Sequence, residues 1–121
     1  MLINLSNHPF VYWSEEQRVE ARNRWGRVED ISFPQIDPLA DTDTVRAIAR
    51  DYCSRCLHLL HEAGETPSAV HLMGEMVFCF HLITLLKAEG VEVVASTARR
   101  NVSYSASVKE TIFDFVTFRN Y

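Results

Sequence analysis

The sequence predicts an α/β fold in which four parallel strands are joined by crossover helices and followed by a C-terminal antiparallel β-hairpin. Short apolar runs alternate with longer segments of helical periodicity, in the order strand, helix, strand, helix, strand, helix, strand. This alternation is typical of parallel strands with right-handed crossovers. Residues 101–107 and 111–119 both alternate in polarity with no helix between them, which indicates the hairpin. The 121 residues suffice for a single domain, residues 1–121.

The first strand and helix have clear limits in the sequence. An apolar strand is expected at residues 2–5, and a run of turn-forming residues ends it at residues 6–9. Ser14 is a good N-cap for a helix that runs to about Trp25 and stops at Gly26.

A second strand and a long helix come next. The strand is expected at residues 28–31, and two prolines make the loop that follows it extended. The helix begins between residues 41 and 43 and ends at Gly64, and its apolar positions recur every three or four residues. It therefore buries one apolar stripe.

The central strand turns directly into a third helix. An apolar run at residues 69–73 stops at Gly74 and restarts as a strongly apolar helical segment. The fourth strand is expected at residues 91–95, and a turn is expected after it at residues 96–100.

Composition and charge exclude several classes of function. The formal net charge is -4, so the chain offers no attractive field for long nucleic acid. No apolar run reaches membrane-spanning length and no secretion signal is evident, so we expect a cytoplasmic protein without a membrane partner. Cys53 and Cys56 form a C-x-x-C inside a helical pattern, where a structural role is favoured because a zinc site would need a second cysteine pair.

Candidate functional residues gather at one edge of the predicted sheet. The carboxyl ends of parallel strands meet at the same edge, so the turns after strands one, three and four should lie close together. These turns contain Ser6, Asn7, His8, Met73, Gly74, Glu75, Ser96, Thr97, Arg99 and Arg100, and Asp37 borders the same edge. Hydroxyls, arginines and helix N-terminal amides suit a phosphate-bearing ligand.

The same features also have purely structural interpretations. Arg99 and Arg100 can be an exposed pair of surface charges without a ligand, and Glu75 at a helix start can interact with the helix dipole. His71 and His81 lie in apolar segments, where core or interface positions are expected. We expect no metal and no cofactor, because the histidine pair on the long helix lacks a carboxylate pattern and no phosphate-binding glycine fingerprint is present.

Four segments resemble those of a known family. The opening Leu-Ile-Asn-Leu-Ser-Asn-His-Pro, the central Val-His-Leu-Met-Gly-Glu-Met, and Val-Ala-Ser-Thr-Ala-Arg-Arg with the closing Phe-Val-Thr-Phe-Arg-Asn-Tyr resemble small stand-alone CRISPR-associated proteins. These are similar to minimal CRISPR-associated Rossmann-fold (CARF) domains, some of which are ring nucleases. The resemblance implies a Rossmann-like three-layer sandwich and a two-fold homodimer. It also implies that a cyclic oligoadenylate, the second messenger of type III CRISPR systems, lies across the symmetry axis.

The resemblance further implies roles for individual residues. Ser6 and Asn7 match the small polar position after strand one and would position the ligand, and Arg99 or Arg100 match the basic position after strand four and would stabilise phosphate. The family's frequent glycine-rich, lysine-containing loop is replaced here by residues 96–100. Arginine stays positively charged and is a poor proton carrier, so replacing the lysine-containing loop is expected to affect catalysis more than ligand binding.

The implied reaction is metal-independent ring opening. A ribose 2′-hydroxyl would attack its own 3′-phosphodiester, with His8 or Glu75 transferring protons, and the products would be linear adenylates with 2′,3′-cyclic phosphate ends. Two alternatives stay open. One is a non-catalytic sensor that binds the same messenger intact, and the other is a small nucleotide- or phosphate-metabolising enzyme on the same fold, which would bind mononucleotides instead.

Overall fold

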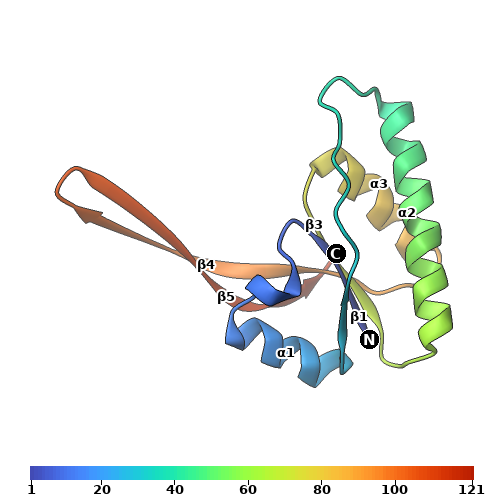
Figure 1. Cartoon of the computed structure of the whole chain (residues 1–121), viewed down its shortest axis with the longest axis horizontal. Helices are drawn as coiled ribbons and strands as arrows, with labels where there is room; N and C mark the ends of the chain where they lie inside the picture. The colour runs from blue at the N-terminus through green and yellow to red at the C-terminus, as the bar shows by residue number, and fades with distance from the viewer.

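A five-stranded mixed β-sheet forms the centre of the protein (Figure 1). The computed structural model describes residues 1–121, and the strand order across the sheet is β2-β1-β3-β4-β5. The strands are β1 (Leu2–Ser6), β2 (Val28–Asp30), β3 (Ala69–Met73), β4 (Val93–Ser105) and β5 (Val108–Asn120). Strands β1 to β4 are parallel, and β5 is antiparallel to β4. The predicted α/β class, mostly parallel with a C-terminal antiparallel pair, is confirmed.

Three helices and one short 3-10 helix connect the strands. They are η1 (Phe10–Tyr12), α1 (Glu15–Trp25), α2 (Thr42–Ala63) and α3 (Met76–Ala88). Ser14 Oγ accepts a hydrogen bond from the Gln17 amide at the start of α1, at 3.2 Å, and Asp41 Oδ1 accepts one from the Thr44 amide at the start of α2, at 2.8 Å. Helix α2 ends at Gly64, whose φ of +59° lies in the left-handed region that glycine adopts without strain. None of the helices combines the length and apolar character that crossing a membrane requires.

The helices cover both faces of the sheet, so the fold has three layers. Successive strand residues point to opposite faces. Accordingly, Leu2 of β1 packs in one apolar cluster with Ala21 and Trp25 of α1, whereas Ile3 packs in a larger cluster that includes Phe78 of α3 and several residues of α2. Helix α1 therefore lies on one face of the sheet and helices α2 and α3 on the other (Figure 1).

Strand β4 is longer than the sequence predicted, and the turn predicted at residues 96–100 is wrong. The strand runs without interruption from Val93 to Ser105 and pairs with β5, with one irregularity of register between Thr97 and Ala98. The sheet consequently has five strands, instead of four parallel strands followed by a separate hairpin. Residues 96–100 contain no glycine or proline, and antiparallel hydrogen bonding to β5 stabilises their extended conformation.

The far halves of β4 and β5 project from the body of the protein as a two-stranded extension (Figure 1). We define the hairpin arm as residues 98–114, all of which are exposed. Only the base of the hairpin, around Phe118, contributes to the core. The arm therefore begins where the rest of the sheet ends.

The strand order creates a point of divergence between β1 and β3. The chain leaves β1 through α1 toward β2 on one side, and it leaves β3 through α3 toward β4 on the other side. Open α/β sheets bind ligands outside the carboxyl ends of their strands at such a switch point. The turns that follow Ser6 and Met73 lie there.

Candidate functional site

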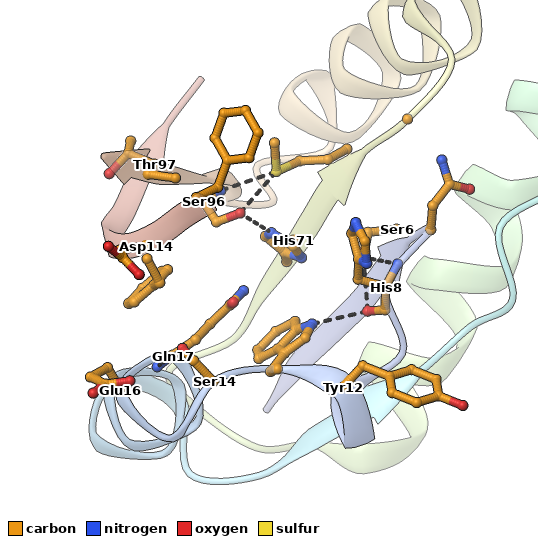
Figure 2. Close-up of a pocket in the computed structure, with 17 residues that line it drawn as sticks. Ser6, His8, Tyr12, Ser14, Glu16, Gln17, His71, Ser96, Thr97 and Asp114 are labelled. Carbon is orange, nitrogen blue, oxygen red and sulfur yellow. Dashed lines mark hydrogen bonds between the residues drawn. The ribbon is translucent and has the colours of Figure 1, made fainter. Parts of the chain in front are cut away.

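A cavity of about 880 Å³ opens beside this switch point (Figure 2). Its walls come from the turn after β1, the segment that enters α1, the end of β3, and the β4–β5 hairpin where its base meets the arm. The lining residues are Ser6, Asn7, His8, Tyr12, Trp13, Ser14, Glu16, Gln17, His71, Met73, Gly74, Ser96, Thr97, Ala98, Phe113, Asp114 and Phe115. Small-molecule sites usually enclose roughly 300–1,000 Å³, so the cavity has the size of a ligand site.

A buried hydrogen-bond network forms the floor of the cavity. Asn4 is 1% exposed, and its Nδ2 donates to the backbone oxygen of His8 and to Asp30 Oδ1, both at 2.8 Å. Its Oδ1 accepts from Ser6 Oγ at 2.8 Å and lies 2.9 Å from Nδ1 of His71. Buried polar groups need partners, and here two contacts of Asn4 reach the end of β1 and the turn after it, one reaches β2 and one reaches β3. Asn4 therefore connects β1, β2 and β3 and fixes the turn after β1.

His71 of β3 lies at the centre of this floor. Its ring meets the rings of Trp13 and Phe118 edge-on, with centroids 5.2 and 5.5 Å away. Its Nε2 lies 3.2 Å from Ser96 Oγ (Figure 2). Burial, with a smaller contribution from His8, lowers the pKa of His71 to about 4, so the imidazole is neutral at neutral pH. The expectation of a buried, hydrogen-bonded His71 is confirmed, but the residue also faces the cavity.

Packing and helix capping shape the turn from β3 into α3. A Cβ on Gly74 would lie 2.2 Å from Cζ of Phe33, so the phenylalanine ring occupies the space that a side chain would need. Glu75 caps the helix, because its carboxylate oxygens accept hydrogen bonds from the Val77 amide at 3.2 Å and the Phe78 amide at 2.7 Å. The free amides expected at this helix N-terminus are therefore occupied by the chain's own carboxylate.

The two arginines expected to contact phosphate lie outside the cavity lining. Arg99 and Arg100 belong to β4 within the hairpin arm, directly beyond Ala98, which does line the cavity. The lining contains no lysine or arginine, and its carboxylates come from Glu16 and Asp114. A single chain consequently presents a cavity of mixed polar and apolar lining, without lysine or arginine, and with two arginines just beyond its edge.

The structure brings together seven of the eleven residues that the sequence singled out. Those that line the cavity are Ser6, Asn7, His8, Met73, Gly74, Ser96 and Thr97. Those that do not are Asp37, Glu75, Arg99 and Arg100. Asp37 instead accepts a hydrogen bond from the Leu39 amide, at 2.9 Å, within the loop before α2.

Sequence reasoning missed an aromatic wall. Tyr12 and Trp13 line the cavity from the segment before α1, and Phe113 and Phe115 line it from β5. Trp13 also anchors the turn after β1, since its Nε1 donates to the backbone oxygen of His8 at 2.9 Å. One signal was present in the sequence, namely the cluster of aromatic residues at positions 10–13, directly after the first candidate turn.

The cysteines do not form a reactive or metal-binding group. Cys53, Cys56 and Cys79 are free and buried. Burial raises the pKa of Cys56 to about 12 and that of Cys79 to about 11, which keeps both thiols protonated. No group of three or more His, Cys, Asp or Glu side chains is arranged to hold a metal ion.

Comparison with known proteins gives one family and no individual relative. The family model described as "Uncharacterized protein MJ1673 family" matches residues 1–119. No curated protein and no solved structure matches the chain.

Proposed function

The chain belongs to the MJ1673 family, and we propose that its switch-point cavity binds cyclic oligoadenylate and that the protein is a metal-independent ring nuclease. The observation that carries the proposal is the cavity itself, which joins the turn after β1 to the base of β4 and sets aromatic rings beside a polar floor. This arrangement, together with the four sequence segments that resemble CARF-like proteins, supports a Rossmann-like domain of that type.

The composition of the cavity suits nucleotides. Tyr12 and Phe113 are exposed, at 78% and 67%, and offer π-faces on which bases stack, worth roughly 1–3 kcal/mol per base in single-stranded RNA and DNA complexes. Ser96 offers its hydroxyl oxygen to a ligand sugar, whereas the hydroxyls of Ser6 and Thr97 are bonded to Asn4 and to the Thr117 backbone. A mixture of aromatic and hydroxyl groups favours a ligand that contains both bases and sugars.

Arg99 and Arg100 fit this proposal in a dimer better than in a single chain. They lie just beyond the cavity on an arm that extends away from the body. In the two-fold homodimer that the resemblance implies, a ring across the axis would extend past the edge of each cavity and meet arginines there. Guanidinium groups would then face the phosphates of the ring, with which they form bidentate hydrogen bonds.

Ring opening would proceed by transfer within the substrate. The 2′-oxygen forms a bond to the adjacent phosphorus, the bond from phosphorus to the 5′-oxygen breaks, and the products carry a 2′,3′-cyclic phosphate and a 5′-hydroxyl. The proton lost by the 2′-hydroxyl is balanced by one gained by the 5′-oxygen. His8 is the candidate for proton transfer because it lines the cavity, whereas Glu75 is engaged in capping α3.

One observation favours a sensor as the second candidate. The cavity lining of a single chain has no arginine or lysine to stabilise the charge that develops on phosphorus, and electrostatic stabilisation of this kind is usually the largest catalytic contribution. A protein that binds the ring without opening it would need only the stacking and hydroxyl contacts.

The test is incubation of the purified protein with cyclic tri-, tetra- and hexa-adenylate in the presence of a chelator, followed by chromatography of the products. Linear adenylates support the nuclease, and an intact ring that co-elutes with the protein supports the sensor. If neither ring opening nor ring binding is observed, both are rejected and mononucleotide binding becomes the next assay.

A double substitution, Arg99→Ala with Arg100→Ala, tests the role of the arm. We expect it to abolish cleavage and to weaken ring binding by at least tenfold, a loss of about 1.4 kcal/mol that is typical of charged hydrogen bonds. Lys109→Ala is the matched control, since it removes a positive charge from the same arm near the hairpin tip, where Lys109 pairs with Tyr104. Unchanged turnover in the arginine double variant would remove both arginines from the mechanism.

A further inference from the structure

The buried network determines the protonation of His71. Asn4 Nδ2 lies 2.8 Å from two acceptors, the backbone oxygen of His8 and Asp30 Oδ1, which orients the amide with its Oδ1 toward His71. A carbonyl oxygen cannot donate, so Nδ1 of His71, 2.9 Å away, must carry the proton of this contact. A neutral imidazole protonated at Nδ1 has a lone pair at Nε2.

That lone pair faces Ser96. The Ser96 Oγ lies 3.2 Å from His71 Nε2 and 3.0 Å from the sulfur of Met73 (Figure 2). A thioether is a weak acceptor, so the hydroxyl proton points to the imidazole nitrogen. The oxygen of Ser96 is then left with its lone pairs as an acceptor for a ligand, and Ser96 lines the cavity. The low pKa of His71, caused mainly by burial, keeps this arrangement the same throughout the neutral pH range.

We propose that Ser96 recognises ribose by accepting a hydrogen bond from a ligand 2′-hydroxyl, and that His71 and Asn4 are positioning residues that hold it in this orientation. The inference rests on the proposed function and narrows its substrate class to ribonucleotides. A 2′-hydroxyl can donate to Ser96, whereas a deoxyribose leaves this acceptor without a partner. We therefore expect the protein to bind a ribonucleotide about tenfold more tightly than the matching deoxyribonucleotide, a ratio that corresponds to one hydrogen bond.

Calorimetric titration with the repeating unit of the ring tests the inference without interference from cleavage. The probes are adenosine 3′-monophosphate and its 2′-deoxy counterpart, which lack the 5′-linked leaving group. We expect the unsubstituted protein to bind the ribose form about tenfold more tightly, and Ser96→Ala to bind both forms with the weaker affinity. Ser54→Ala is the control, because its hydroxyl donates only to the Arg50 backbone oxygen, on α2.

The outcomes separate this inference from the proposed function. Equal affinity for the two sugars, no binding of either, or an unchanged ratio in Ser96→Ala overturns the inference. A preserved ribose preference with no opening and no binding of cyclic oligoadenylates rejects the proposed function and leaves the inference in place.

Two further measurements test the positioning role. His71→Phe keeps an aromatic ring but removes the lone pair, and we expect its ribose preference to disappear, whereas Met73→Leu should retain the preference. Loss of preference in Met73→Leu would show that sulfur orients Ser96 and would overturn the role of His71. Nitrogen-15 NMR of the unsubstituted protein gives the tautomer directly, and a neutral ring protonated at Nε2 would also overturn it.

Discussion

Substitution of Gly74 tests why the turn between β3 and α3 contains a glycine. Its place in the turn after β3 made Gly74 a candidate ligand contact, but the structure gives a packing reason for the glycine instead. A Cβ built on Gly74 meets three atoms of the Phe33 ring at 2.2, 2.4 and 2.8 Å. All three distances are far below ordinary contact, so the ring of Phe33 has to move when Gly74 is replaced by alanine.

The size of the effect follows from what restrains that ring. Phe33 packs edge-on against the fully buried Phe78, with centroids 5.2 Å apart, so displacement disturbs the core beneath α3. Forcing extra volume into packed sites costs roughly 1–3 kcal/mol, and we expect Gly74→Ala to lower the free energy of unfolding by about 2 kcal/mol. In a chain of this size the melting temperature should fall by roughly 6–10 °C.

The assay is urea unfolding followed by circular dichroism, carried out as a double-mutant cycle. Phe33→Ala removes the obstructing ring, so Gly74→Ala should cost little in that background, giving a coupling of about 1–2 kcal/mol. An equal loss of stability with and without Phe33 would refute the packing argument. A stable Gly74→Ala variant that loses only ligand binding would refute it too, and would return Gly74 to the role that the sequence suggested.

Three other predictions concern the groups around the site. The pKa of His71 is lowered to about 4 in the folded protein, so between pH 7 and pH 4 the unfolded chain binds a proton that the folded chain does not. The free energy of unfolding should therefore fall by up to about 3 kcal/mol as the pH drops from 7 toward 4. In urea titrations at different pH values, His71→Gln should lack this part of the pH dependence. An identical pH dependence in the variant would contradict the assignment. Removing the α3 cap with Glu75→Ala should lower the free energy of unfolding by about 1 kcal/mol, whereas Glu89→Ala at the other end of α3 should not destabilise the protein. Equal losses of stability in the two variants would contradict the capping role of Glu75. Burial raises the pKa of the Cys56 thiol to about 12 and that of the Cys79 thiol to about 11. We therefore expect Ellman's reagent to label neither cysteine in the folded protein at pH 8 and both after unfolding. Labelling of the folded protein at the rate of a free thiol would show that these thiols are accessible.

The local elements follow from short-range signals in the sequence. Ser14, Gly26 and Gly64 act on the backbone within a few residues of their own positions, and the helix limits they predict are the ones observed. The alternation of strands and helices likewise determined that the first four strands are parallel, since each crossover connection constrains only its own two strands. The topology then placed the turns after Ser6 and Met73 at one edge.

Tertiary structure alone decided the features that depend on long-range pairing and packing. The extended conformation of residues 96–100 comes from pairing with residues 113–118 of β5, 13 to 22 positions away in the sequence, and it removes Arg99 and Arg100 from the edge where a turn would have put them. Asn4 and His71 look like ordinary strand residues in the sequence, and they become the floor of a cavity only because β1 and β3 are neighbours, with their side chains 2.9 Å apart. Hydrogen bonds and contacts between distant segments carry no local signal, so the floor of this site could be recognised only after the chain was folded.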